Sequence, residues 1–96
     1  MDSEVRRYIL GVTMDDYESI ETLSSQAIYL PSLVGKETSI EAISKAVEQL
    51  CIEGSLQCYE YSTTEKSFLV TRFQPGLEPD ALWFLNRDSK ALAHGN

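Results

Sequence analysis

Very few side chains in this sequence have the chemistry of an enzyme or of a metal site. The only histidine, His94, lies near the C-terminal end, and the two cysteines, Cys51 and Cys58, do not share a CxxC spacing. A nucleophile needs a base within hydrogen-bond reach, and the two thiols lack the further ligands that a zinc site requires. We therefore predict no catalytic residue, no metal and no cofactor, and interpret both cysteines as small buried or half-buried thiols.

Two short segments look catalytic but have simpler interpretations. Residues 35–38, Gly-Lys-Glu-Thr, are similar to the end of a phosphate-binding loop, yet Leu30 stands where that motif requires its first glycine and Glu37 separates the lysine from the threonine. Asp15 and Asp16 are adjacent carboxylates, which a helix N-terminus would explain through its dipole. An enzyme is therefore not expected.

The composition is that of an acidic globular domain. The chain has 96 residues, 15 acidic and 8 basic side chains, a net charge of −7 with the histidine neutral, and 43% hydrophobic residues. This length fits a single domain, residues 1–96. An isoelectric point near 4.5 opposes free nucleic-acid binding, because cationic side chains must neutralise phosphates. No stretch resembles a membrane span or a secretory signal, so we expect a cytoplasmic protein without membrane contact.

The N-terminal elements are predicted from capping patterns and apolar spacing. Residues 1–4 are predicted as a loose tail. Residues 5–12 are either a short strand or an N-terminal extension packed on the core, because so short a run has no decisive period. The first clear helix is predicted at residues 13–28, where Thr13 and Asp16 fit a capping pattern. Its apolar face is predicted to comprise Tyr17, Ile20, Leu23, Ala27 and Ile28.

A second helix follows a short connector. Residues 29–37 contain a proline and a glycine and have room for one helical turn at 31–34. The second helix is predicted at residues 38–53, beginning with a capping box at Thr38. Gly54 then supplies the left-handed residue at which such a helix ends.

After this helix the period changes to that of strands. Alternation with aromatic residues predicts a hairpin, and Asn86 is predicted to cap a final helix. A strand is predicted at residues 55–61, followed by a turn at 62–66 and a return strand at 67–73. A loop at 74–80 then leads to a third strand at 81–85 and a helix at 87–93. The domain is thus predicted to have an N-terminal extension at residues 5–12 and a helical part at 13–53. A wing or hairpin part follows at 55–85, and a terminal helix at 86–94. The predicted core comprises Tyr17, Ile20, Leu23, Ile28, Leu33, Ile40, Ile43, Val47, Leu50, Leu56, Phe84, Leu85 and Leu92.

Two local motifs resemble those of winged helix-turn-helix domains. Residues 50–56, Leu-Cys-Ile-Glu-Gly-Ser-Leu, look like the junction "leucine, three residues, glycine, x, leucine" between the third helix and the wing of such domains. Residues 83–92, Trp-Phe-Leu-Asn-Arg-Asp-Ser-Lys-Ala-Leu, are similar to the stretch that follows the wing. There Asn86 replaces the usual capping threonine, Lys90 the usual arginine and Ser89 the usual glycine.

The resemblance covers residues 13–92 and implies an α+β, winged-helix-like fold. Helices would be followed by a β-hairpin or small antiparallel sheet and then by a short C-terminal helix. The connector at residues 29–37 departs from the family pattern, because it leaves little room for the usual second helix.

The resemblance also implies a nucleic-acid face. Winged domains commonly place their third helix in the DNA major groove, which here would be the helix at 38–53, with the turn at 62–66 as the wing tip. Glu41 and Glu48 lie on the same helix and would repel phosphates. The candidate nucleic-acid face comprises Lys36, Ser39, Ser44, Lys45, Gln49, Lys66 and Arg72.

A second candidate surface is acidic. Its residues, in the first predicted helix, are Asp15, Asp16, Glu18 and Glu21. Such a surface suits a basic protein partner. We therefore expect a non-enzymatic regulatory domain that binds a macromolecule, with protein slightly favoured over DNA. The alternatives are a DNA-binding transcriptional regulator that uses the helix at 38–53 and the wing, and an acidic inhibitor or adaptor of unrelated α+β fold. A homodimer is left open, and no small-molecule substrate is indicated.

Overall fold

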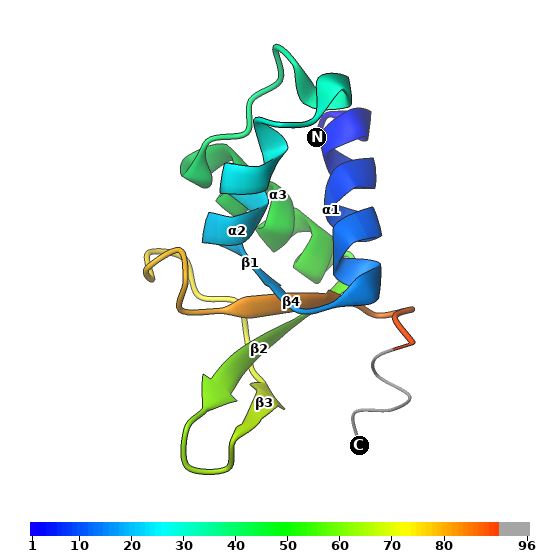
Figure 1. Cartoon of the computed structure of the whole chain (residues 1–96). Helices are drawn as coiled ribbons and strands as arrows, with labels where there is room; N and C mark the ends of the chain where they lie inside the picture. The colour runs from blue at the N-terminus through cyan, green and yellow to red at the C-terminus, as the bar shows by residue number, and fades with distance from the viewer. Residues whose placement is uncertain (91–96) are drawn as a thin grey trace.

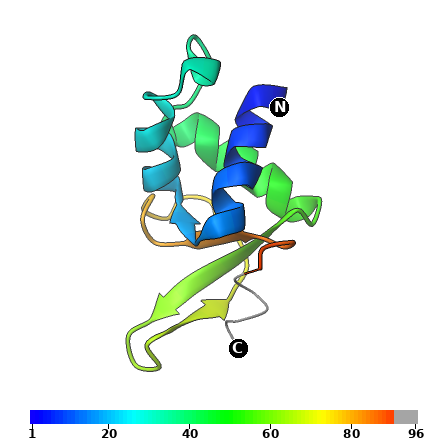
Figure 2. The same cartoon turned by 45° about the vertical axis from the view of Figure 1, so that its right-hand side comes forward.

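The computed structural model describes residues 1–90, in which three helices lie on one side of a four-stranded antiparallel sheet (Figure 1). The prediction of an α+β fold is therefore confirmed. The β2–β3 hairpin extends away from the helices, as the turned view also shows (Figure 2). The elements are α1 Ser3–Asp15, β1 Glu18–Ser19, α2 Ile20–Ala27, the 3-10 turn η1 Pro31–Leu33, α3 Ile40–Ile52, β2 Leu56–Ser62, β3 Ser67–Val70 and β4 Trp83–Asn86.

Helix α1 corrects the prediction for the N-terminus. Where a tail at residues 1–4 and a strand or extension at 5–12 were expected, a helix begins at Ser3; Asp2 caps it, accepting hydrogen bonds from the N–H groups of Glu4 and Val5 at 2.8 and 3.2 Å. Its buried side chains recur at helical spacing and comprise Val5, Tyr8, Ile9 and Thr13. The expectation of packing against the core was right, but the expectation of an extended strand was wrong.

The predicted helix at residues 13–28 is interrupted. Helix α1 ends at Asp15, and α2 begins only after β1. Thr13 is not a helix cap, because its hydroxyl lies inside α1 and donates to the Ile9 carbonyl at 2.7 Å. Ser19 caps α2 instead, accepting from the Thr22 N–H at 3.2 Å. Helix α2 is therefore the second helix of the chain, for which the predicted connector at residues 29–37 had left little room, and α3 is the third.

The connector and α3 follow the prediction closely. The helical turn expected at 31–34 is η1, within residues 31–33. Helix α3 was predicted at 38–53, and its cap is Ser39 rather than Thr38, with the Ser39 hydroxyl accepting from the Ala42 N–H at 3.2 Å. Gly54 follows α3 at a φ of 88°, a conformation that favours glycine.

Strand β2 is paired on both sides, because its first half pairs with β4 and its second half with β3. The sheet order is β1-β4-β2-β3. In the first half Cys58 lies opposite Phe84, and in the second half Tyr61 lies opposite Phe68. The return strand expected at 67–73 ends at Val70, and the strand expected at 81–85 lies at 83–86.

The predicted terminal helix is absent from residues 87–90, and the rest of its predicted range lies outside the described residues. Asn86 ends β4 instead of starting a helix. Its side-chain amide donates to the Leu10 carbonyl at 3.0 Å, and the Ser89 hydroxyl donates to the Met14 carbonyl at 2.7 Å. The segment after β4 is therefore tied to α1.

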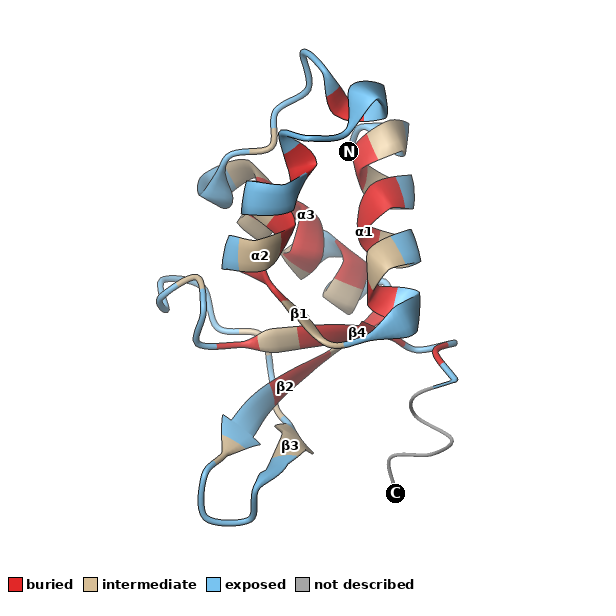
Figure 3. Ribbon diagram, in the orientation of Figure 1, coloured by how far each residue is buried: buried red, intermediate tan, exposed pale blue. Residues whose placement is uncertain are grey.

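The core lies between the helices and the sheet (Figure 3). The prediction is confirmed for most of its residues: Ile20, Leu23, Leu33, Ile43, Val47, Leu50, Leu56, Phe84 and Leu85 are buried. It is wrong for Ile28 and Ile40, whose exposed fractions are 70% and 46%. Tyr17 is half-buried, and Leu92 lies outside the described residues. The prediction missed the buried face of α1 and, outside it, Ala46, Cys58 and Leu82.

Candidate functional site

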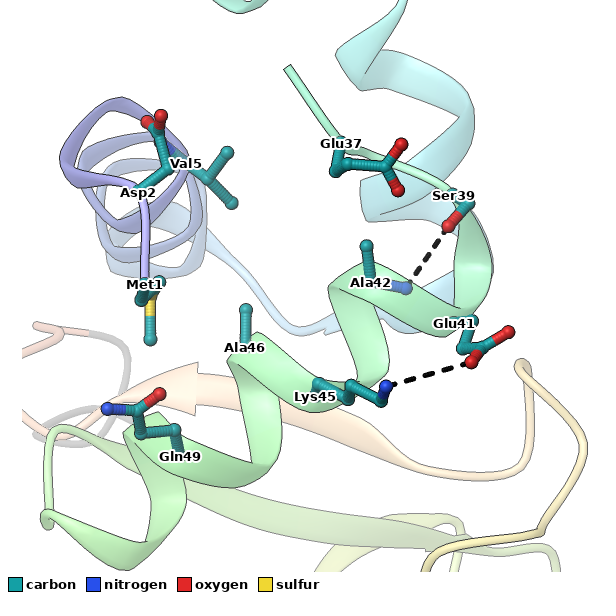
Figure 4. A pocket seen from close by; sticks show the side chains of 10 residues that line it. All are labelled: Met1, Asp2, Val5, Glu37, Ser39, Glu41, Ala42, Lys45, Ala46 and Gln49. Carbon is teal, nitrogen blue, oxygen red and sulfur yellow. Dashed lines mark hydrogen bonds and ion pairs between the residues drawn. The ribbon is translucent and has the colours of Figure 1, made fainter.

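The face of α3 that was predicted to bind nucleic acid borders a groove. The groove has a volume of about 430 Å³ and lies between the start of α1 and α3 (Figure 4). Ser39, Lys45 and Gln49, three of the predicted nucleic-acid residues, line it from the side of α3. Met1, Asp2 and Val5 line it from α1, Glu37 lies just before α3, and the remaining lining residues are Glu41, Ala42 and Ala46. The groove therefore combines an apolar floor with a charged rim.

The two predicted lysines beside this groove are already paired with carboxylates of the chain. The Lys36 ammonium lies 2.9 Å from the Asp2 carboxylate, and the Lys45 ammonium lies 3.7 Å from Glu41. The hydrogen bond between Lys36 and Asp2 raises the pKa of the lysine and lowers the pKa of the aspartate. Phosphates would have to compete with the Asp2 carboxylate for Lys36 and would meet the charge of Glu41 beside Lys45.

The remaining residues of the predicted nucleic-acid face do not join this site. Ser44 lies half-buried on α3. Lys66 lies in the turn of the β2–β3 hairpin, where its φ is 54°. Arg72 follows β3 and lines a different pocket. The structure thus brings together Ser39, Lys45 and Gln49, but it places Lys66 and Arg72 elsewhere.

The predicted protein-partner face is spread over the junction of three elements. Asp15 and Asp16 lie at the C-terminal end of α1, Glu18 lies in β1 and Glu21 in the first turn of α2; we call these residues the acidic junction. Within residues 1–90 none of them forms an ion pair with a basic side chain. Burial, and then the nearby Asp16, raise the pKa of Glu18. The helix-dipole explanation holds only for Glu21, because a helix C-terminus disfavours negative charge.

An aromatic cluster lies next to the acidic junction. Tyr17, between Asp16 and Glu18, stacks on Phe68 with ring centroids 3.9 Å apart, and Phe68 lies edge-on to Trp83 at 5.7 Å. Tyr59 and Tyr61 complete the cluster.

Strand alternation fixes the face of this cluster. The paired Cys58 and Phe84 belong to the core beneath the helices, so the next pair, Tyr59 and Trp83, points to the opposite face of the sheet. The contacts of these rings with one another are those of sheet packing: Tyr59 is buried, Tyr17, Phe68 and Trp83 are half-buried, and Tyr61 is 47% exposed.

The two cysteines have the properties of buried thiols. Burial raises the pKa of Cys51 to about 11 and that of Cys58 to about 12. Both therefore stay protonated near neutral pH, and a protonated thiol is a poor nucleophile and a poor metal ligand. No group of three or more histidine, cysteine or acidic side chains is placed to hold a metal ion within the described part of the chain.

No helix among residues 1–90 is both long and apolar enough to cross a membrane. Comparisons with family models, with curated proteins and with solved structures found no match to this chain.

Proposed function

We propose that this chain is a non-enzymatic, winged-helix-like regulatory domain that binds a protein partner in the groove between α1 and α3. The winged-helix part of the proposal is supported by the order of the elements, in which a third helix leads into a hairpin and β4 returns between β1 and β2. The groove borders that third helix, on the face that a winged domain would present to its partner.

One observation carries the choice of protein over DNA. Lys36 is held by Asp2 at 2.9 Å, and the exposed Lys45 lies 3.7 Å from Glu41, so a carboxylate of the chain itself offsets each cation beside the groove. DNA binding depends on cations that displace the counterions of phosphates, and Asp2, Glu37 and Glu41 leave this face without an excess of positive charge.

The groove suits an amphipathic helix with basic flanks. Ala42 and Ala46 are one helical turn apart on α3, and their small side chains allow a close approach of a second helix. Met1 and Val5 extend the apolar surface on the side of α1. Glu37 on the rim forms no ion pair within residues 1–90, so it is available to a lysine or arginine of the partner. Such binding places the apolar face of one helix into a groove of another protein.

The test uses a labelled peptide of leucine and lysine, about 18 residues or five helical turns long, with one apolar and one basic face. We expect saturable binding in fluorescence anisotropy. Ala42→Trp fills the groove and should weaken binding by about tenfold or more. Glu37→Lys should weaken it by about threefold, because it repels the basic flank.

Matched controls separate the groove from general attraction to an acidic protein. Gln26→Trp adds the same side chain at an exposed position of α2, and Glu65→Lys makes the same charge change in the hairpin turn. Neither control should change the affinity by more than about twofold. Equal losses in the variants and their controls would overturn the proposal. So would micromolar binding to duplex DNA in about 50 mM salt that Lys45→Ala abolishes.

A further inference from the structure

A second pocket lies at the opposite end of α3 from its cap. It has a volume of about 300 Å³ and lies between the end of α3, the start of β2 and the segment after β3. Arg72 and Arg87 both line it, although they are far apart in the sequence. It shares no lining residue with the groove between α1 and α3.

The two arginines differ from most cations of the described chain. Arg6, Arg7, Lys36 and Lys45 all form ion pairs with carboxylates. Neither Arg72 nor Arg87 does so within residues 1–90. Glu48 is the one carboxylate that lines their pocket. In a chain whose net charge is −7, this pocket therefore has an excess of positive charge among its lining residues.

The charge of Arg87 reaches the interior of the pocket. Burial is the main influence on the pKa of Cys51, which it raises, and the positive charge of Arg87 opposes that rise. Cys51 itself lines the pocket and is half-buried. An anionic group beside Cys51 would therefore feel the attraction of this guanidinium and the smaller opposing influence of Glu48, which raises the same pKa.

The pocket also has an apolar wall. Phe73 is half-buried, and Ile52, at the end of α3, is 81% exposed. Gln57 and Thr71 add polar side chains. Pockets for small molecules have volumes of about 300–1,000 Å³ and combine apolar walls with a few polar groups.

We propose that this pocket binds a small phosphate monoester with an apolar body. Arg72 and Arg87 would hold the doubly charged phosphate, since a guanidinium forms paired hydrogen bonds to phosphate oxygens. Ile52 and Phe73 would contact the apolar body. The site is separate from the groove of the proposed function, and each can fail without the other.

The test is a titration of the full chain with phenyl phosphate, followed by the amide resonances in ¹H–¹⁵N spectra. We expect saturable shifts that centre on Cys51, Arg72 and Arg87. Arg72→Gln and Arg87→Gln should each weaken binding by about tenfold, because each removes a charge-assisted contact. Glu48→Gln should strengthen binding, because it removes the carboxylate that repels the phosphate.

Arg7→Gln is the matched control, since Arg7 lies exposed on α1 and pairs with Glu4. It should leave the affinity unchanged, and each variant should retain the dispersed spectrum of the folded protein. The absence of saturable shifts, or weakening by Arg7→Gln equal to that by Arg87→Gln, would overturn the site. Equal affinity for inorganic phosphate would overturn the role of the apolar wall. Tighter binding of duplex DNA at the same residues would assign the arginines to nucleic acid instead.

Discussion

Tyr8 links α1 to α2 through a single buried hydroxyl. The hydroxyl donates a hydrogen bond of 2.6 Å to the Leu23 carbonyl, and the side chain is 8% exposed. Burial raises the pKa of Tyr8 to about 12, with a further rise from Glu18, so the hydroxyl keeps its proton as a donor throughout the neutral range. This contact ties the N-terminal helix, which also forms one wall of the groove, to α2.

Tyr8→Phe should therefore lower the free energy of unfolding by about 1–2 kcal/mol, because it removes a buried hydrogen bond and keeps the ring. Urea denaturation followed by circular dichroism measures this change. Tyr29→Phe is the control, since Tyr29 is 80% exposed and should tolerate the same substitution without loss. Equal stability of the two variants would contradict the role assigned to Tyr8.

Arg6 and Glu53 join the start of α1 to the end of α3. The guanidinium makes two hydrogen bonds to the carboxylate, at 2.9 and 2.5 Å. The hydrogen bond from Arg6, followed by the one from Ser55, lowers the pKa of Glu53 from 4.5 to about 2. Because the folded-state pKa is the lower one, the pair stabilises the folded protein above about pH 4.5 and loses this effect as the pH falls towards 2.

An NMR titration of the side-chain carboxyl carbons tests this pair. Glu53 should titrate near pH 2 in the unmodified chain, and in Arg6→Gln its pKa should rise towards 4.5. The difference in stability between the unmodified chain and Glu53→Gln should shrink as the pH falls through the same range. A Glu53 pKa that Arg6→Gln does not change would show that the pair does not form in solution.

At the scale of elements, α3 is the helix on which most of the fold depends. Its apolar face packs on α2, α1 and β2, and Ile43, Val47 and Leu50 have no exposed surface. Its amphipathic pattern is also the clearest in the sequence. Leu50 lies close to the end of this face, near the junction with β2.

Leu50→Ala should lower the free energy of unfolding by about 2–5 kcal/mol, because it leaves a cavity in the packed core. This is a large part of the total of about 5–15 kcal/mol that is typical of such a domain. Ile52→Ala is the control on the same helix, since Ile52 is 81% exposed, and it should change stability by less than about 0.5 kcal/mol. A loss below about 1 kcal/mol for Leu50→Ala in a urea melt would mean that this helix face is misplaced.

The sequence predicts the second half of the chain better than the first. Helix α3 and the hairpin have local signals, namely a cap, a glycine stop and a change of period, and these signals lie within a few residues of the observed boundaries. The predicted helix at 13–28 missed the break at β1, because the spacing of Tyr17 and Ile20 continues the helical pattern across it. That break depends on the pairing of Glu18 with Phe84, a contact that no local pattern reveals.

The sites are less predictable than the elements, because they depend on contacts between distant residues. Ser39, Lys45 and Gln49 share a helix face, as their spacing predicted. The wall of the groove that the start of α1 forms was not predicted, since residues 1–4 were expected to be a tail. The pairing of Lys36 with Asp2 and the pocket that Arg72 and Arg87 both line also join residues that are distant in sequence. The helical spacing of Val5, Tyr8 and Ile9 was the one available signal for α1.

At the scale of the whole molecule, the net charge of −7 is distributed unevenly. The acids beside α3 are partly neutralised, because Asp2 and Glu41 hold lysines. The acidic junction forms no such ion pairs within residues 1–90. Asp15 and Asp16 also lie at a helix C-terminus, where the dipole disfavours them. The chain thus keeps negative charge where it costs stability, at the end of α1 away from the groove, and this charge adds to the general attraction of a basic partner to the molecule.

Asp15→Lys should therefore stabilise the fold, by about 0.3–1 kcal/mol, because it places a positive charge at the C-terminal end of the α1 dipole. Glu65→Lys in the hairpin turn is the control: each variant replaces one negative by one positive charge and changes the net charge from −7 to −5. Relief of general repulsion would stabilise both variants equally, whereas the dipole acts on Asp15 alone. The difference between their urea midpoints, measured at low salt, isolates the dipole effect, and it should shrink as salt is added. A gain that is equal in the two variants would mean that Asp15 carries no local cost, and the acidic junction would then need no explanation beyond a solvated surface.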